Sequence, residues 1–115
     1  MKTAIELRLR FKRGDQVVIG PGKIELLEAI STTGSISAAA RVLGMSYRRA
    51  WLLVDDMNRG LVTPVVSATT GGNRGGGTVL TPTAHEIIAR YRSIEATALT
   101  AVASDLALLV GLIAP

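Results

Sequence analysis

The sequence has 115 residues, enough for one domain, and 48% of them are hydrophobic, which argues against a disordered chain. Thirteen basic and nine acidic residues give a formal net charge of +4, so a polyanion is the first partner to consider. Only 3% are aromatic, cysteine is absent and His85 is the single histidine, which argues against base-stacking surfaces, disulfides, thiolate or multi-histidine metal sites and most histidine-based catalysis.

The charge is distributed unevenly along the chain. Residues 1–92 carry a net charge of +6, whereas residues 93–115 carry −2, so the chain divides into a basic body and an apolar tail. The N-terminal residues contain no apolar core of signal-peptide length. Together with the absence of cysteine, this favours a cytoplasmic protein.

Residues 3–13 alternate between apolar and charged side chains, and this period of two predicts a half-buried strand. After a turn at Gly14, residues 17–19 return as a second strand, so residues 1–20 are predicted to form a β-hairpin. The apolar face consists of Ile5, Leu7, Leu9 and Phe11, and the basic face of Arg8, Arg10, Lys12 and Arg13. We interpret the basic face as solvated or edge-protecting, because it is distant in sequence from the motif below; the alternative is a non-specific attraction for DNA.

Three helices are predicted over residues 21–32, 36–43 and 47–59. Pro21 suits the first turn of a helix, and Ser35 and Ser46 are predicted N-caps. The second and third helices have the spacing of a helix-turn-helix, because the small residue Ala40 lies four positions before Gly44, in a turn too tight for a side chain. The alternative is an ordinary helical hairpin. The predicted core positions are Ile24, Leu27, Ile30, Ile36, Ala39, Ala40, Leu43, Ala50, Leu53 or Val54, and Met57.

The helix that follows Ser46 begins with Tyr47, Arg48 and Arg49. The first residues of a recognition helix reach base edges in the major groove, where bidentate arginine–guanine pairing is the commonest specific contact. Ser46 and the helix N-terminus suit a phosphate. The alternative for the two arginines is a solvated face. Trp51 is predicted to pack in the core between this helix and the following hairpin rather than to contact DNA.

Residues 61–80 contain two short β-branched segments on either side of a glycine-rich stretch, and a hairpin here is predicted to be a wing. Gly72, Asn73, Arg74 and Gly75 are the predicted contacts, with the arginine neutralising a phosphate or entering the minor groove. A nucleotide-binding loop is disfavoured, because the stretch lacks the Lys-Ser/Thr ending of a P-loop and precedes a strand.

The last helix is predicted over residues 82–112, with Thr81 as its N-cap and Pro82 in its first turn. The uninterrupted apolar run from Leu106 to Pro115 is about half as long as a membrane span. Apolar surface of this size is typical of an interface, so residues 81–115 are predicted to form a dimerisation helix.

These elements in this order resemble the N-terminal DNA-binding domain of the ModE family of molybdate-responsive transcription regulators, a branch related to the LysR-type winged helix. The resemblance runs from about Ile5 to Ala96 and rests on GSISAAA (34–40), GMSYRRAW (44–51), DMN (56–58), ATTGG (68–72) and GGG (75–77). It implies a homodimeric repressor or activator in which Ser46, Tyr47, Arg48 and Arg49 face DNA and residues 71–77 form the wing. Family members carry oxyanion-binding domains after the dimer helix. Because no residues follow Pro115 here, we expect no molybdate binding and no cofactor.

We therefore predict an α+β, mostly helical fold, with one winged helix-turn-helix domain over residues 1–115 divided into a hairpin (1–20), a three-helix core (21–60), a wing (61–80) and a dimerisation helix (81–115). The predicted function is a cytoplasmic, homodimeric transcriptional regulator that binds double-stranded DNA by sequence, without enzymatic activity, a metal site or a membrane partner. The predicted DNA-binding residues are Ser35, Ser46, Tyr47, Arg48, Arg49, Gly72, Asn73, Arg74 and Gly75. The alternatives are a protein-interaction module and a non-specific DNA-binding protein with the same fold.

Overall fold

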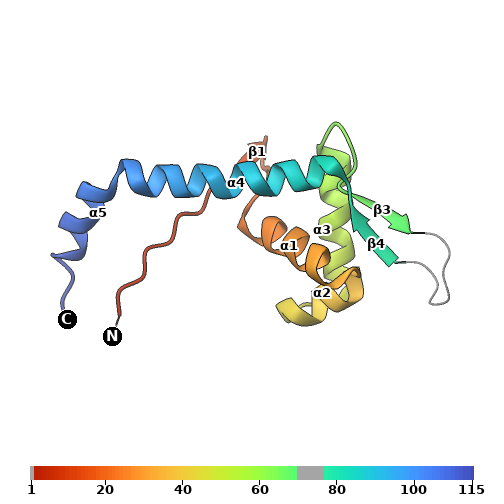
Figure 1. Cartoon of the computed structure of the whole chain (residues 1–115), viewed down its shortest axis with the longest axis horizontal. Coiled ribbons are helices and arrows are strands. Elements are labelled where there is room, and N and C mark those ends of the chain that lie inside the picture. Colours follow the sequence, from red (N-terminus) through yellow and green to blue (C-terminus); the bar gives the residue numbers. More distant parts are fainter. Residues whose placement is uncertain (1, 70–76) are drawn as a thin grey trace.

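The computed structural model describes residues 2–69 and 77–115. Within these residues the chain forms five helices and two antiparallel two-stranded sheets, an α+β and mostly helical winged-helix fold (Figure 1). The elements in chain order are β1 (Phe11–Arg13), β2 (Gln16–Ile19), α1 (Pro21–Thr33), α2 (Ile36–Leu43), α3 (Tyr47–Gly60), β3 (Val66–Thr69), β4 (Gly77–Leu80), α4 (Pro82–Ala101) and α5 (Ala103–Val110).

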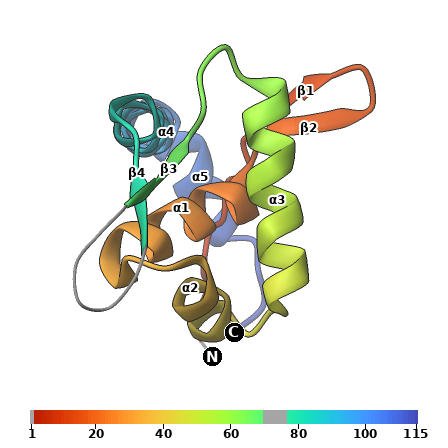
Figure 2. The same cartoon turned by 90° about the vertical axis from the view of Figure 1, so that its right-hand side faces the viewer.

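The core lies among α1, α2, α3 and the two strands of the wing. Ile24, Leu27 and Ile30 of α1 are at most 1% exposed, which confirms their predicted core positions. On α3 the buried stripe consists of Ala50, Val54 and Met57. Figure 2 shows α3 in front, with the β1–β2 hairpin on one side of it and α1 and the wing strands on the other. The core therefore fixes where the outer face of α3 points.

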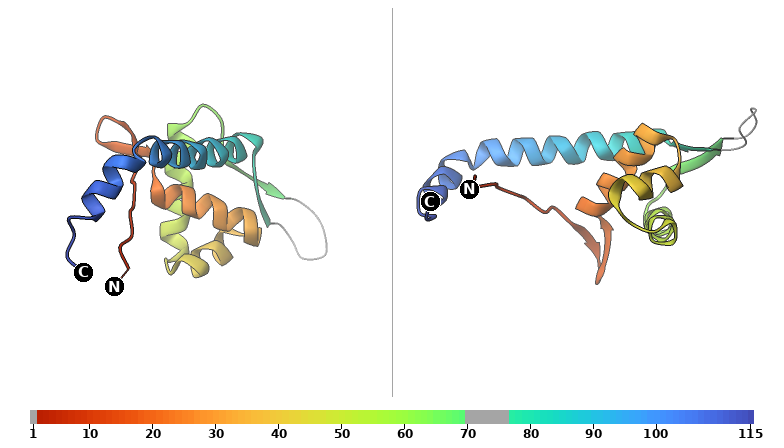
Figure 3. Two further views of the ribbon diagram at one scale, coloured as in Figure 1. Left: turned by 60° about the vertical axis from the view of Figure 1, so that its left-hand side comes forward. Right: turned by 90° about the horizontal axis from the view of Figure 1, so that it is seen from below.

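The predicted strand over residues 3–13 is wrong for most of its length. Only Phe11–Arg13 pair with β2, and residues 2–10 are extended without strand partners. β2 has four residues and so has no backbone groups left for a longer partner. Instead, the hydroxyl of Tyr91 donates a hydrogen bond to the carbonyl oxygen of Leu9 at 2.7 Å. The segment runs from the hairpin toward α5 (Figure 3).

The alternation of residues 3–13 nevertheless separates two faces. Leu7 and Leu9 line a shallow hollow with Ile94 of α4. Arg8 and Arg10 line a second groove, on the side of α3, and Arg8 also lies at the first hollow. The period of two therefore predicted that Arg8 and Arg10 share a groove, but not the hydrogen-bonded partner of the backbone.

The single last helix predicted over residues 82–112 is also wrong. α4 ends at Ala101, Val102 has φ −108° and ψ 17°, and α5 leaves at an angle of 67°. The bend lets Leu106 and Val110 line a hollow with Leu99 of α4, which a straight continuation would carry away. Leu106 and Val110 are half-buried there, and this partial burial of apolar surface favours the bend. Among the described residues, no single helix has the length and apolar content of a membrane span, and α4 and α5 reach it only together, across this bend.

Arg92 joins α4 to α1. Its Nη2 and Nε lie 2.6 and 3.0 Å from the two carboxylate oxygens of Glu28, and its Nη1 lies 2.7 Å from Glu95. The hydrogen bonds that Arg92 donates to the two carboxylates raise its pKa, so the guanidinium stays charged throughout the accessible pH range. The bidentate contact fixes the direction in which α4 leaves the body.

Candidate nucleic-acid interface

α2, the turn after it and α3 have the geometry of a helix-turn-helix. The Oγ of Ser35 accepts a hydrogen bond from the N–H of Ala38 at 2.8 Å, and the Oγ of Ser46 accepts one from the N–H of Arg49 at 3.1 Å, so both predicted N-caps are confirmed. Gly44 has φ +68°, a left-handed conformation that favours glycine. Each serine hydroxyl keeps its own hydrogen, which is free to be donated to a phosphate.

α3 presents three faces around its axis, because successive helical residues point about 100° apart. Ala50, Val54 and Met57 form the buried face. Arg48 and Leu52 lie opposite them, on the outer face, and both side chains are exposed. Arg49 lies on a flank, where it lines a groove with Leu53 and Asp56. The two arginines that the sequence places side by side therefore point in different directions.

The core position predicted for Trp51 is wrong. Its side chain is 47% exposed, so it does not pack in the core between α3 and the wing. Trp51 follows Ala50 of the buried stripe. The rotation of about 100° between successive helical residues turns the Trp51 side chain to the surface, beside Tyr47, which is 56% exposed. The start of α3 therefore exposes two aromatic rings next to Arg48.

The wing is confirmed as an antiparallel hairpin, with Val66 opposite Leu80 and Thr69 opposite Gly77. The N–H of Thr78 donates to the carbonyl oxygen of Gly34 at 3.0 Å, which ties β4 to the end of α1. The Oδ1 of Asn58 accepts a hydrogen bond from the N–H of Val65 at 2.8 Å and holds the loop between α3 and β3. The predicted contacts at Gly72, Asn73, Arg74 and Gly75 lie outside the described residues.

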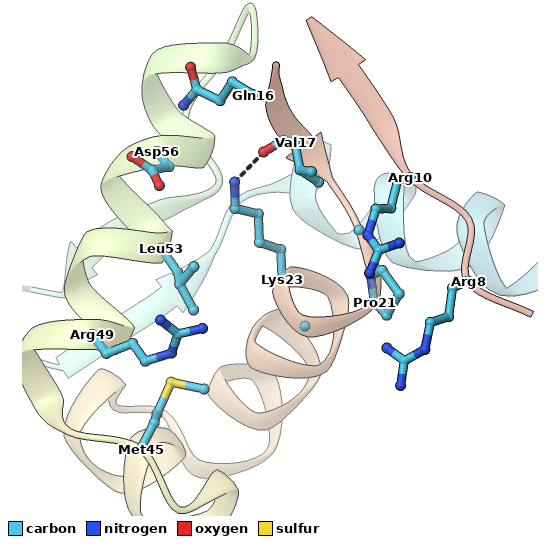
Figure 4. A pocket seen from close by; sticks show the side chains of 12 residues that line it. Arg8, Arg10, Gln16, Val17, Pro21, Lys23, Met45, Arg49, Leu53 and Asp56 are labelled. Carbon is cyan, nitrogen blue, oxygen red and sulfur yellow. Dashed lines mark hydrogen bonds between the residues drawn. The ribbon is translucent and has the colours of Figure 1, made fainter. Parts of the chain in front are cut away.

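A basic groove runs between α3 and the N-terminal segment, and its volume is about 380 Å³. Arg8 and Arg10 lie on one side of it and Arg49 on the other, with Lys23 of α1 between them (Figure 4). The ammonium group of Lys23 donates a hydrogen bond to the carbonyl oxygen of Val17, and the Lys23 side chain is buried. Asp56 is the one carboxylate among the residues that line the groove. We call these five charged residues the basic groove.

The sequence did not lead us to this groove. We interpreted the basic face of the N-terminal segment as solvated because it is distant in sequence from the helix-turn-helix: Ser35 comes 25 residues after Arg10. The fold removes that separation by laying the segment beside α3. The only signal in the sequence was the alternation itself, which puts Arg8 and Arg10 on one face.

Groups of three or more metal-ligating side chains are absent from residues 2–69 and 77–115, and His85 is exposed at the surface of α4. The polar side chains of the interface are mainly cations, hydroxyls and amides, with Asp56 as the carboxylate of the groove. Such groups suit hydrogen bonding to phosphates and to base edges.

Comparison with known proteins shows which family has this arrangement of elements. Residues 22–85 match the family described as bacterial regulatory helix-turn-helix proteins of the lysR family. The DNA-binding domain in a solved structure described as "Crystal structure of CbnR_DBD-DNA complex" superposes with a TM-score of 0.57 at 19% identity, over 76% of this chain and 95% of that one. At this identity the likeness shows the fold.

Three curated relatives are similar to this chain, and the names of the first two mention molybdenum. The chain is 54% identical over 78 residues to the molybdenum-pterin-binding protein MopB of Rhodobacter capsulatus, and 47% identical over 73 residues to the molybdenum transport protein ModE of Azotobacter vinelandii. It is 37% identical over 86 residues to the DNA-binding transcriptional dual regulator ModE of Escherichia coli K12. These matches cover 68%, 64% and 75% of this chain but only 29%, 27% and 33% of the three relatives.

Proposed function

We propose a function from one premise: this chain belongs to the lysR family of bacterial regulatory helix-turn-helix proteins. The function is that of a transcriptional regulator that binds double-stranded DNA by sequence and acts as a homodimer. One observation carries it: the N-terminus of α3 presents Arg48 outward from a helix-turn-helix whose two caps and glycine turn are in place. The names of the relatives, a transcriptional dual regulator among them, support it.

In the proposed complex, α3 lies in the major groove. Arg48 reaches a guanine edge through its two terminal nitrogens, while Ser35 and Ser46 contact phosphates from the helix N-termini. The wing hairpin lies against the sugar–phosphate backbone or the minor groove. The base contact supplies the discrimination between sequences, and the phosphate contacts fix the position of the helix.

The proposed dimer uses the C-terminal helices. α4 leaves the body of the molecule, and apolar side chains are exposed at Ile94 of α4, at Val102 in the bend, and at Leu108 and Leu109 of α5. Covering them with a second copy removes apolar surface from water. A two-fold dimer places two copies of α3 on successive turns of the major groove, about 34 Å apart. The predictions of a cytoplasmic protein without a cofactor stay predictions.

The test is fluorescence anisotropy of the protein with a pool of random duplexes at two salt concentrations, followed by sequencing of the bound fraction. We expect salt-dependent binding that enriches a two-fold symmetric site. R48Q is expected to lose this enrichment, whereas the control R90Q, which removes the same charge from the exposed surface of α4, is expected to keep it. Binding without enrichment contradicts sequence-specific regulation and favours a non-specific DNA-binding protein. No binding at either salt concentration favours a protein-interaction module.

A further inference from the structure

The basic groove holds more positive charge than the fold neutralises. Four cations, Arg8, Arg10, Lys23 and Arg49, face one carboxylate, that of Asp56. In the part of the chain that the structure describes, the ion pairs use Arg59, Arg90 and Arg92, and none of them includes an arginine of the groove. Like charges gathered without counter-charges repel one another, so the groove favours an anion.

One cation of the groove stabilises the fold, and the other three are available to bind a ligand. Lys23 is only 8% exposed and its ammonium group is committed to the carbonyl oxygen of Val17. Arg8, Arg10 and Arg49 are exposed at the rim. Guanidinium groups present several donors in one plane and match the oxygens of a phosphate. The rim is therefore equipped for phosphate groups.

The groove is continuous with the proposed DNA interface. Arg49 lies in the first turn of α3, directly after Arg48 and within the turn capped by Ser46. A duplex that brings a base edge to Arg48 also brings its backbone past the flanks of α3. The flank with Arg49 faces the side chains of Arg8 and Arg10 (Figure 4).

We propose that the basic groove is a second DNA-contact surface, in which Arg8 and Arg10 of the N-terminal segment and Arg49 of α3 bind backbone phosphates beside the major-groove site. This rests on the proposed function, because it adds contacts to the same complex. It gives the N-terminal segment a role in DNA binding, with the alternating sequence bringing two arginines to one face.

The test is the double variant R8Q/R10Q, with K12Q/R13Q as its matched control. The control removes the same charge from the same segment, at exposed positions of β1 that do not line the groove. R8Q/R10Q is expected to bind the selected site and a random duplex more weakly by the same factor, between about 3- and 30-fold, and to flatten the slope of log K against log salt by about 1.8, for two phosphates. K12Q/R13Q is expected to change the slope by less than half as much.

Phosphate ethylation interference adds a readout that depends on position rather than on total charge. With the unmodified protein, ethylation is expected to interfere with binding at phosphates that flank the major-groove site, and with R8Q/R10Q the interference at these phosphates alone is expected to disappear. R8K/R10K, which keeps both charges, is expected to retain most of the affinity and guards against a change in folding. Circular dichroism spectra of all variants are compared for the same purpose.

The outcomes separate this proposal from the one it rests on. If the unmodified protein binds no duplex, both are overturned. If it binds and R8Q/R10Q has the same affinity, slope and footprint, only the groove proposal is overturned. Inorganic phosphate, exchanged for chloride at constant ionic strength, is the competitor. If millimolar phosphate binds the unmodified protein through Arg8 and Arg10 without weakening its binding to DNA, the groove takes a free anion and its assignment to the DNA backbone is overturned.

Discussion

Gly60, the last residue of α3, lies directly against Val18 of β2. A Cβ atom at Gly60 would lie 2.9 Å from Cγ1 of Val18, closer than real Cβ atoms approach their neighbours. The contact places the N-terminal hairpin against the C-terminal end of α3. Because the hairpin leads into the segment that carries Arg8 and Arg10, this contact also sets the position of one side of the basic groove.

Gly60→Ala is therefore expected to lower the free energy of unfolding by about 1–3 kcal/mol, because Val18 and β2 must shift to make room. Gly111→Ala is the control, since its Cβ would meet no atom closer than 3.5 Å. Urea denaturation of both variants measures the difference. Equal stabilities for the two variants would contradict the close contact.

Arg48→Ala and Arg49→Ala are expected to change DNA binding in different ways. Arg48 points outward, so its loss is expected to cost about 1–3 kcal/mol at one base pair and to relax specificity there. Arg49 lines the basic groove, so its loss is expected to weaken all sequences alike and to flatten the salt dependence by about 0.9. Binding to a panel of single-base variants of the selected site, at several salt concentrations, distinguishes them. Relaxed specificity in both variants would show that both arginines read bases.

Arg92→Met is expected to destabilise the protein by about 1 kcal/mol, because it removes the bidentate contact with Glu28 and leaves two carboxylates close together. Arg90→Met is the control. Its pair with Glu86 lies within one helix, with side chains 77% and 64% exposed against 43% and 38% for Arg92 and Glu28. We expect its loss to cost less than about 0.5 kcal/mol. Thermal unfolding measures the stability of the two variants. Similar losses of stability would mean that the contact between α4 and α1 contributes no more than an exposed ion pair within one helix.

Tyr91→Phe is expected to change the alkaline limb of the stability curve. Burial raises the pKa of Tyr91, with a further rise from Glu95, so the folded protein holds the phenolic proton more tightly than the unfolded chain. The stability this contributes is complete below the unfolded pKa, near 10, and is lost as the pH rises through the higher folded pKa. At pH 8 the variant is expected to be less stable by about 0.5–1.5 kcal/mol, because it lacks the hydrogen bond to Leu9.

Urea midpoints between pH 8 and pH 11 measure this effect. The curve for Tyr91→Phe is expected to be flatter than that of the unmodified protein and to approach it as the pH rises. Two parallel curves would show that deprotonation of Tyr91 does not cause the loss of stability at alkaline pH.

Ile94→Glu is expected to shift the protein from dimer to monomer. Ile94 is 45% exposed and lines an apolar groove on α4 with Ile87 and Tyr91. A carboxylate there would be buried without a partner in the proposed dimer, at a high cost in free energy. The control is Ala96→Glu, which lies about 200° around the same helix. Sedimentation velocity reports the species present, and a dimer that persists in Ile94→Glu would place the interface elsewhere.

Local patterns in the sequence determined the helices and their caps. Ser35, Ser46 and Thr81 act through neighbours three residues away, and Gly44 acts through its own backbone angle, so the information for these features is contained in short windows. The buried stripe of α3 and the two faces of residues 3–13 follow from helical and strand periodicity in the same way. The family resemblance rested on the same windows.

The tertiary structure decided which residues lie against each face of these elements. The N-terminal segment is not a long strand, because β2 is short and Tyr91, 82 residues away, takes the carbonyl of Leu9. The last helix bends, and the bend brings the half-buried Leu106 and Val110 of α5 to a hollow that Leu99 of α4 also lines. Arg49 meets Arg8 and Arg10 rather than sharing the direction of Arg48, because contacts between distant segments place the hairpin beside α3. Periodicity specifies the direction of a side chain around its own element, whereas its neighbours depend on packing between elements that no local window contains.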